Sequence, residues 1–147
     1  MKKLLIVGIV GTLFIATLSS VALGKEVGIG VRVILASHEE KAMDTRLQDI
    51  QKNLDTLNYS SYQLLQERSF LLAQGQSGQL PLAGNKELYV KLLHEEGGTA
   101  EIAVEILQGG KGIFKTTAKL KEGGTLLIGG PKYEEGVLIL AIAAQKP

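Results

Sequence analysis

The chain of 147 residues contains no cysteine and no tryptophan, and it has only three prolines, four tyrosines and three phenylalanines. Without cysteine there is no disulfide, no thiolate metal site and no lipid attached to an N-terminal cysteine. So few aromatic rings supply little for stacking sugars or bases. The 16 basic and 15 acidic residues nearly cancel, so the composition carries no electrostatic footprint for nucleic acid. The fold must therefore be held by its apolar core.

Residues 1–24 have the pattern of a secretory signal. Lys2 and Lys3 form its positive end, residues 4–16 are almost wholly apolar, and Ala22-Leu23-Gly24 offers small residues for a signal peptidase. We expect a signal peptide over residues 1–24 and a single domain over 25–147, periplasmic or secreted, with no membrane insertion after the signal is removed. The alternative is an uncleaved anchor, because the segment approaches the roughly 20 apolar residues that span a bilayer.

The first part of the domain has the pattern of a strand, a helix and a second strand. Apolar residues at every second position in 27–35 indicate a strand with one buried face. Ser37 and Glu40 fit a capping box, which predicts that a helix begins at Ser37. A second strand follows over residues 59–70, and two strands joined in this way are expected to be parallel. The helix is expected to pack on the sheet through one apolar stripe, made of Met43, Leu47, Ile50, Leu54 and Leu57.

The rest of the chain has short apolar runs separated by glycine-rich turns, which indicates an antiparallel meander. The expected strands cover residues 80–82, 88–93, 100–107, 113–120, 126–128 and 137–143. The last run has so few polar residues that we expect a central strand covered on both faces. The predicted fold class is α+β: a strand–helix–strand unit followed by an antiparallel β meander, as a sheet or sandwich, with one packed amphipathic helix.

Two similar tripeptides are the candidate chemical groups. His38-Glu39-Glu40 and His94-Glu95-Glu96 each follow the end of a predicted strand, and imidazole with carboxylate can hold zinc. His38, Glu39, His94 and Glu95 are therefore the candidate metal ligands. The same residues also suit a helix N-terminus and a solvated turn. We assign no catalytic or cofactor-binding residue and expect no cofactor.

The segment from Gly129 to Tyr133 is predicted to be an exposed loop. Rigid exposed loops often carry function, so Gly129, Gly130, Pro131 and Tyr133 are candidate binding residues. A turn that only reverses the chain is the alternative.

Residues 115–130 contain a strand pattern, then Glu122-Gly123-Gly124, then threonine with apolar residues, then Gly129-Gly130. This order resembles a hairpin of bacterial secretins, the outer-membrane channels of secretion and pilus systems. The long channel-forming region has no counterpart here, so the resemblance implies no secretin function. In layout, the whole chain resembles small exported bacterial proteins of unknown function.

These observations together favour an exported, non-enzymatic envelope protein with an accessory, structural or binding role through its β-sheet and loops. Its expected partner is another envelope protein. The alternative is a small metal-dependent hydrolase that uses His38 and His94.

We predict that signal peptidase cleaves after Gly24, so that the exported protein begins at Lys25. Mass spectrometry of the protein recovered from the native cell measures this directly. An intact chain that still carries Met1 in the membrane fraction would support the anchor instead.

Overall fold

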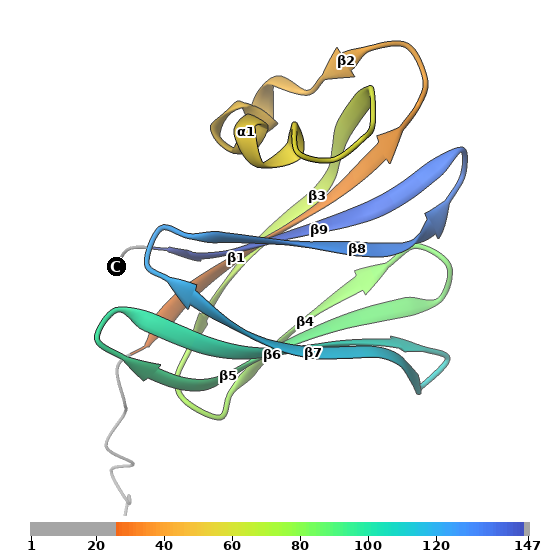
Figure 1. Ribbon diagram of the computed structural model, residues 1–147. Helices are drawn as coiled ribbons and strands as arrows, with labels where there is room; N and C mark the ends of the chain where they lie inside the picture. Colours follow the sequence, from red (N-terminus) through yellow and green to blue (C-terminus); the bar gives the residue numbers. More distant parts are fainter. Residues whose placement is uncertain (1–25, 146–147) are drawn as a thin grey trace, which may run out of the picture.

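The computed structural model describes residues 26–145, which form two packed β-sheets and one short helical segment (Figure 1). The five-stranded sheet has the order β2-β3-β1-β9-β8, and the four-stranded sheet has the order β4-β5-β6-β7. The helical segment lies on the far side of the five-stranded sheet from the four-stranded sheet (Figure 1). The fold is thus mostly β, with a meander-like antiparallel sheet and little helix.

The elements have the following bounds. The five-stranded sheet contains β1 (Val27–Ser37), β2 (Ala42–Met43), β3 (Ser61–Leu72), β8 (Thr125–Tyr133) and β9 (Gly136–Gln145). The four-stranded sheet contains β4 (Ser77–Leu82), β5 (Lys86–Glu96), β6 (Thr99–Gln108) and β7 (Lys111–Lys121). The helical segment consists of the 3-10 helix η1 (Thr45–Ile50) and the α-helix α1 (Gln51–Leu54).

The main core lies between the two sheets, where alternate residues of each strand meet. Val31 of β1, Val104 of β6 and Leu140 of β9 are fully buried there. A second, smaller core lies between the five-stranded sheet and the helical segment. We call the face of the sheet toward this second core the outer face.

Strand β9 contributes to both cores. Leu140 and Ile142 point into the main core, whereas Ile139 and Ala141 lie under the helical segment. Because β9 also lies between β1 and β8, the prediction of a central strand covered on both faces is confirmed.

Glycine turns connect the strands of the four-stranded sheet as expected. Gly97 and Gly98 have φ of 59° and 82°, and Gly109 and Gly110 have φ of 58° and 83°. Two successive residues with positive φ match the right-handed twist of a hairpin, and glycine adopts this conformation without steric cost. The meander of β4 to β7 therefore follows from local turn chemistry.

The prediction that a helix begins at Ser37 is wrong. Ser37 is the last residue of β1, and its carbonyl accepts a hydrogen bond from Ser60 N at 3.0 Å, so it is held in the sheet. The helical segment begins after Asp44, whose carboxylate accepts from Arg46 N at 3.0 Å. The cap is thus an aspartate seven positions later, after the short strand β2.

The expected parallel arrangement of the first two strands is also wrong, because β1 and β3 are antiparallel, with Val27 opposite Leu72 and Ser37 opposite Ser61. The helical segment covers only part of the length of β1: the 11 residues of β1 extend about 35 Å, whereas η1 and α1 together advance about 18 Å. The chain does not return to the start of β1. Ser60 N donates to the Ser37 carbonyl at 3.0 Å, so β3 begins beside the end of β1.

The connection at Glu122-Gly123-Gly124 is not a hairpin. β7 pairs with β6, and β8 pairs with β9 in the other sheet, so the chain crosses between sheets at this turn. The two arms of segment 115–130 therefore have different neighbours, although their local pattern is that of a hairpin.

The middle of the predicted apolar stripe packs on the sheet as a helical segment, but Met43 lies in β2 and Leu57 lies beyond the end of α1. Leu47 and Leu54 are fully buried and Ile50 nearly so, while Met43 and Leu57 are partly buried beside them. The Tyr62 hydroxyl of β3 donates to the carbonyl of Leu54 at 2.9 Å and ties the end of α1 to the sheet.

We predict that Leu54→Ala lowers the free energy of unfolding by about 2–5 kcal/mol, because it empties a fully buried site. Lys52→Ala, an exposed position in the same helix, is the matched control and changes this energy by less than about 0.5 kcal/mol. Urea denaturation of the two variants gives both values. Equal losses would show that the stripe does not pack against the sheet.

A hollow on the outer face as candidate functional site

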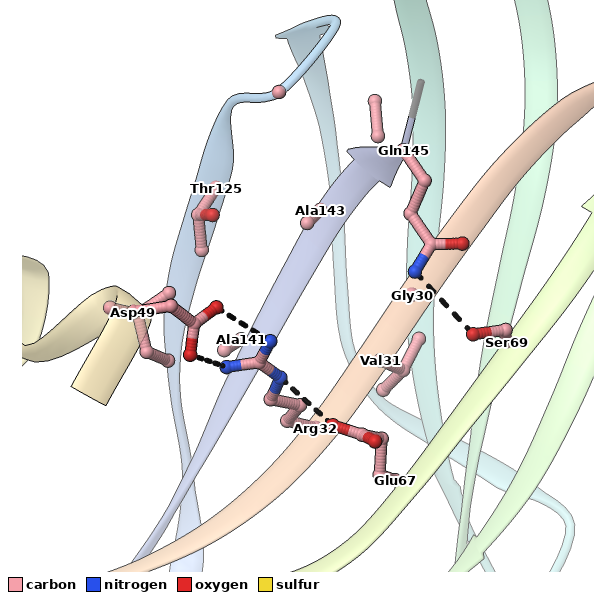
Figure 2. Close-up of a pocket in the computed structure, with 13 residues that line it drawn as sticks. Gly30, Val31, Arg32, Asp49, Glu67, Ser69, Thr125, Ala141, Ala143 and Gln145 are labelled. Atoms are coloured by element: carbon pink, nitrogen blue, oxygen red, sulfur yellow. Dashed lines mark hydrogen bonds and ion pairs between the residues drawn. The ribbon is translucent and has the colours of Figure 1, made fainter. Parts of the chain in front are cut away.

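The helical segment covers only part of the outer face. Beyond it, β1 and β9 present Gly30 and Ala143, which lie opposite each other in the ladder. Small side chains here leave a hollow of about 320 Å³, shown in Figure 2. We call it the outer hollow; it is lined chiefly by Gly30, Arg32, Asp49, Glu67, Ser69, Thr125, Ala141, Ala143 and Gln145.

Arg32 forms the boundary between the outer hollow and the helical segment. Its two terminal nitrogens donate to the two carboxylate oxygens of Asp49 in η1, at 2.8 and 2.7 Å. Its Nε lies 3.0 Å from a carboxylate oxygen of Glu67 in β3. Figure 2 shows the guanidinium between these two carboxylates, so one side chain of β1 connects the helical segment to β3.

The ion pair between Arg32 and Asp49 shifts the pKa values of both of its members. The hydrogen bonds from Arg32 lower the pKa of Asp49, and the bond to Asp49 raises the pKa of Arg32. Both groups therefore keep their charges over the physiological pH range. The pair is suited to holding a fixed shape and less suited to exchanging protons.

Neutral hydrogen-bonding groups form much of the remaining wall. Gln145 Nε2 lies 3.5 Å from the Ser69 hydroxyl, and Thr125 adds a second hydroxyl on the other side of Ala143 (Figure 2). At Gly30 the fit is close, because a Cβ there would lie 2.8 Å from Gln145 Nε2. These groups can donate to and accept from a polar ligand, such as an amide or a hydroxyl.

A second hollow of about 200 Å³ adjoins the first and shares Ala144 and Gln145 with it. It lies at the start of β1, where Glu26 and Gly28 meet Leu71 of β3. The Leu71 side chain is 65% exposed, the highest value among the exposed large apolar residues.

The candidate metal ligands are not brought together. His38 directly follows the end of β1, where its ring stacks on Tyr59 with centroids 4.9 Å apart. Glu95 lines the second hollow at the start of β1, and the neighbouring His94 pairs with Glu96 at 3.4 Å. The two tripeptides thus lie near opposite ends of a strand that extends about 35 Å. Across residues 26–145, no three histidine, cysteine, aspartate or glutamate side chains are grouped to hold a metal ion.

The prediction of an exposed loop at residues 129–133 is wrong, because these residues form part of a strand. Gly129, Gly130, Pro131 and Tyr133 belong to edge strand β8, whose register with β9 breaks between Gly129 and Lys132. Tyr133 packs against the main core. Position 130 has no room for a side chain, because a Cβ on Gly130 would lie 2.9 Å from the carbonyl oxygen of Leu138. The turn itself falls one step later, at Glu134 and Glu135.

Sequence reasoning missed the outer hollow. The available signal was on β1, where Gly28, Gly30 and Arg32 share one face of an otherwise apolar alternation. Two glycines and a cation on one face indicate a surface that no apolar layer covers. The partners Asp49 and Glu67 come from distant positions and carry no such signal.

Comparison with protein-family models, curated proteins and solved structures finds no match to this chain. Within the part of the chain that the structure describes, none of the helices has the length and apolar character to cross a membrane.

We predict that Asp49→Asn lowers stability at pH 7 by less than about 1 kcal/mol, because the Asp49 side chain is 59% exposed and water screens the pair. The folded-state pKa of Asp49 lies below its ordinary value of 3.8, so the pair stabilises the fold above that pH and is lost as pH falls through the folded-state pKa. The difference between parent and variant should therefore shrink as the pH drops below 3.8.

Urea denaturation at a series of pH values measures this difference. Glu40→Gln, which removes an exposed carboxylate in the connection after β1, is the control for a general charge effect. A difference for Asp49→Asn that stays constant down to the lowest pH would contradict the assignment of the ion pair.

Proposed function

We propose that this is a non-enzymatic protein of the cell envelope, periplasmic or secreted after loss of residues 1–24, that binds another envelope protein through the outer hollow. The observation that carries the proposal is the half-covered outer face. One half is closed by Leu47, Ile50 and Leu54, and the other half is an open hollow with a floor of glycine and alanine.

The chemistry of the hollow supports binding. Its hydroxyl and amide groups suit a polar ligand, and its carboxylates at Asp49 and Glu67 are already engaged with Arg32. A carboxylate whose pKa is lowered is a poor proton donor at neutral pH, which argues against acid catalysis by Asp49. A rigid rim around an open floor favours recognition.

The alternative of a metal-dependent hydrolase requires both histidines on one ion. Zinc–nitrogen bonds are about 2 Å long, so ligands of one ion lie within a few ångströms of each other. The positions of His38 and Glu95 at opposite ends of β1 give this alternative no support.

A bulky side chain on the floor of the outer hollow tests this proposal. We predict that Ala143→Phe abolishes capture of the envelope partner, with recovery reduced more than about tenfold, because a phenyl ring would occupy the space above Gly30. Ala103→Phe is the matched control: Ala103 is also a half-exposed alanine facing outward from an inner strand, but of the four-stranded sheet.

Both variants and the parent are used as bait for affinity purification from the native envelope, and the captured proteins are identified by mass spectrometry. Thermal melting confirms that each bait is folded. Undiminished capture by Ala143→Phe, or equal loss with Ala103→Phe, would refute the outer hollow as the binding site.

A further inference from the structure

Strand β3 is an edge of the five-stranded sheet over most of its length. On the side away from β1, the strand β2 pairs only with Ser61 and Tyr62. At the next edge position, Leu64, side chains replace a neighbouring strand as hydrogen-bond partners. Asp44 Oδ2 accepts from Leu64 N at 3.1 Å, and Arg46 donates to the Leu64 carbonyl at 3.3 Å. From residue 65 to residue 72, no described residue forms a ladder with this side of β3.

The other three edges of the two sheets carry features that discourage strand addition. β7 has four lysines, at positions 111, 115, 119 and 121; β4 contains Pro81; and β8 contains Pro131 next to a break in register. Lysine and proline are residues with which proteins protect sheet edges. Residues 65–72 contain neither, although the β1–β3 ladder also shifts register at Leu65, and they expose Leu65 and Leu71 at 39% and 65%.

The free edge lies beside both hollows. Glu67 and Ser69 project from β3 to the outer hollow, as Figure 2 shows, and Leu71 lines the adjoining hollow. These three residues alternate along the strand, so they share the outer face. A strand added to β3 would place its own alternate side chains next to them.

We propose that the partner adds an extended strand to residues 65–72 of β3, with a basic side chain beside Glu67 and an apolar side chain beside Leu71. This inference rests on the proposed function and specifies the form of its partner. Main-chain hydrogen bonds to the free edge provide affinity, and the alternate side chains provide specificity. Arg32 engages one oxygen of the Glu67 carboxylate, and this side chain is 55% exposed, so a basic side chain of the added strand can reach the other oxygen.

The probe is a synthetic peptide of alternating threonine and valine with terminal caps, in which one outward position is lysine and the position four residues away is leucine. It is titrated into the folded protein, and the backbone amide signals are followed by NMR. We expect shifts concentrated at residues 65–72. A copy of the peptide with an N-methylated backbone cannot donate to the edge and should cause none of them.

The same NMR titration tests whether a basic side chain of the peptide pairs with Glu67. A peptide with glutamate in place of lysine should bind about two- to fivefold more weakly. This preference should vanish in Glu67→Gln and persist in Glu101→Gln, which removes an outward-facing carboxylate from the inner strand β6.

Three results would overturn the proposal: no shift at residues 65–72 with millimolar peptide, equal binding of the N-methylated copy, or a lysine preference that survives Glu67→Gln. These outcomes are separable from failure of the proposed function. If the peptide does not bind β3 while Ala143→Phe still loses the envelope partner, the result supports binding at the outer hollow and contradicts strand addition.

Discussion

The outer face of the five-stranded sheet is longer than the helical segment that covers it. The six residues of η1 and four of α1 bury Ile34, Tyr62 and Ile139 and reach no further. Apolar side chains beyond this point would face water, at an unfavourable free energy of about 25 cal/mol for each Å² of apolar surface. On β1 and β9, glycine and alanine occupy these positions instead, at Gly28, Gly30 and Ala143, and the hollows follow from that choice, whereas Leu71 of β3 stays exposed.

Arg32 lies where the covered and open halves meet. The Arg32 side chain is only 25% exposed, so without partners its guanidinium would lose hydration, and Asp49 and Glu67 compensate from opposite sides. Its bidentate bond to Asp49 also fixes η1 against β1, at the point where the second core ends. The same ion pairs thus anchor the helical segment and form one wall of the outer hollow, which joins the stability of the fold to the shape of the site.

The free edge of β3 also results from limited coverage. Strand β2 has only two residues and pairs with only two residues of β3, and the side chains of Asp44 and Arg46 extend the pairing by one residue more. The rest of the edge stays open beside the hollow. In the four-stranded sheet, the lysines of β7 occupy the edge that this strand forms.

The sequence by itself determined features that depend on near neighbours. The positive φ values at Gly97-Gly98 and Gly109-Gly110, the burial of Leu47 and Leu54 and the two covered faces of β9 all follow from turn chemistry or from periodicity. Tertiary structure alone decided the direction of β3, the separation of β7 from β8 and the meeting of Arg32 with Asp49 and Glu67. The physical reason is that strand partners and sheet membership depend on contacts between distant residues, and a local apolar pattern is equally satisfied by either sheet.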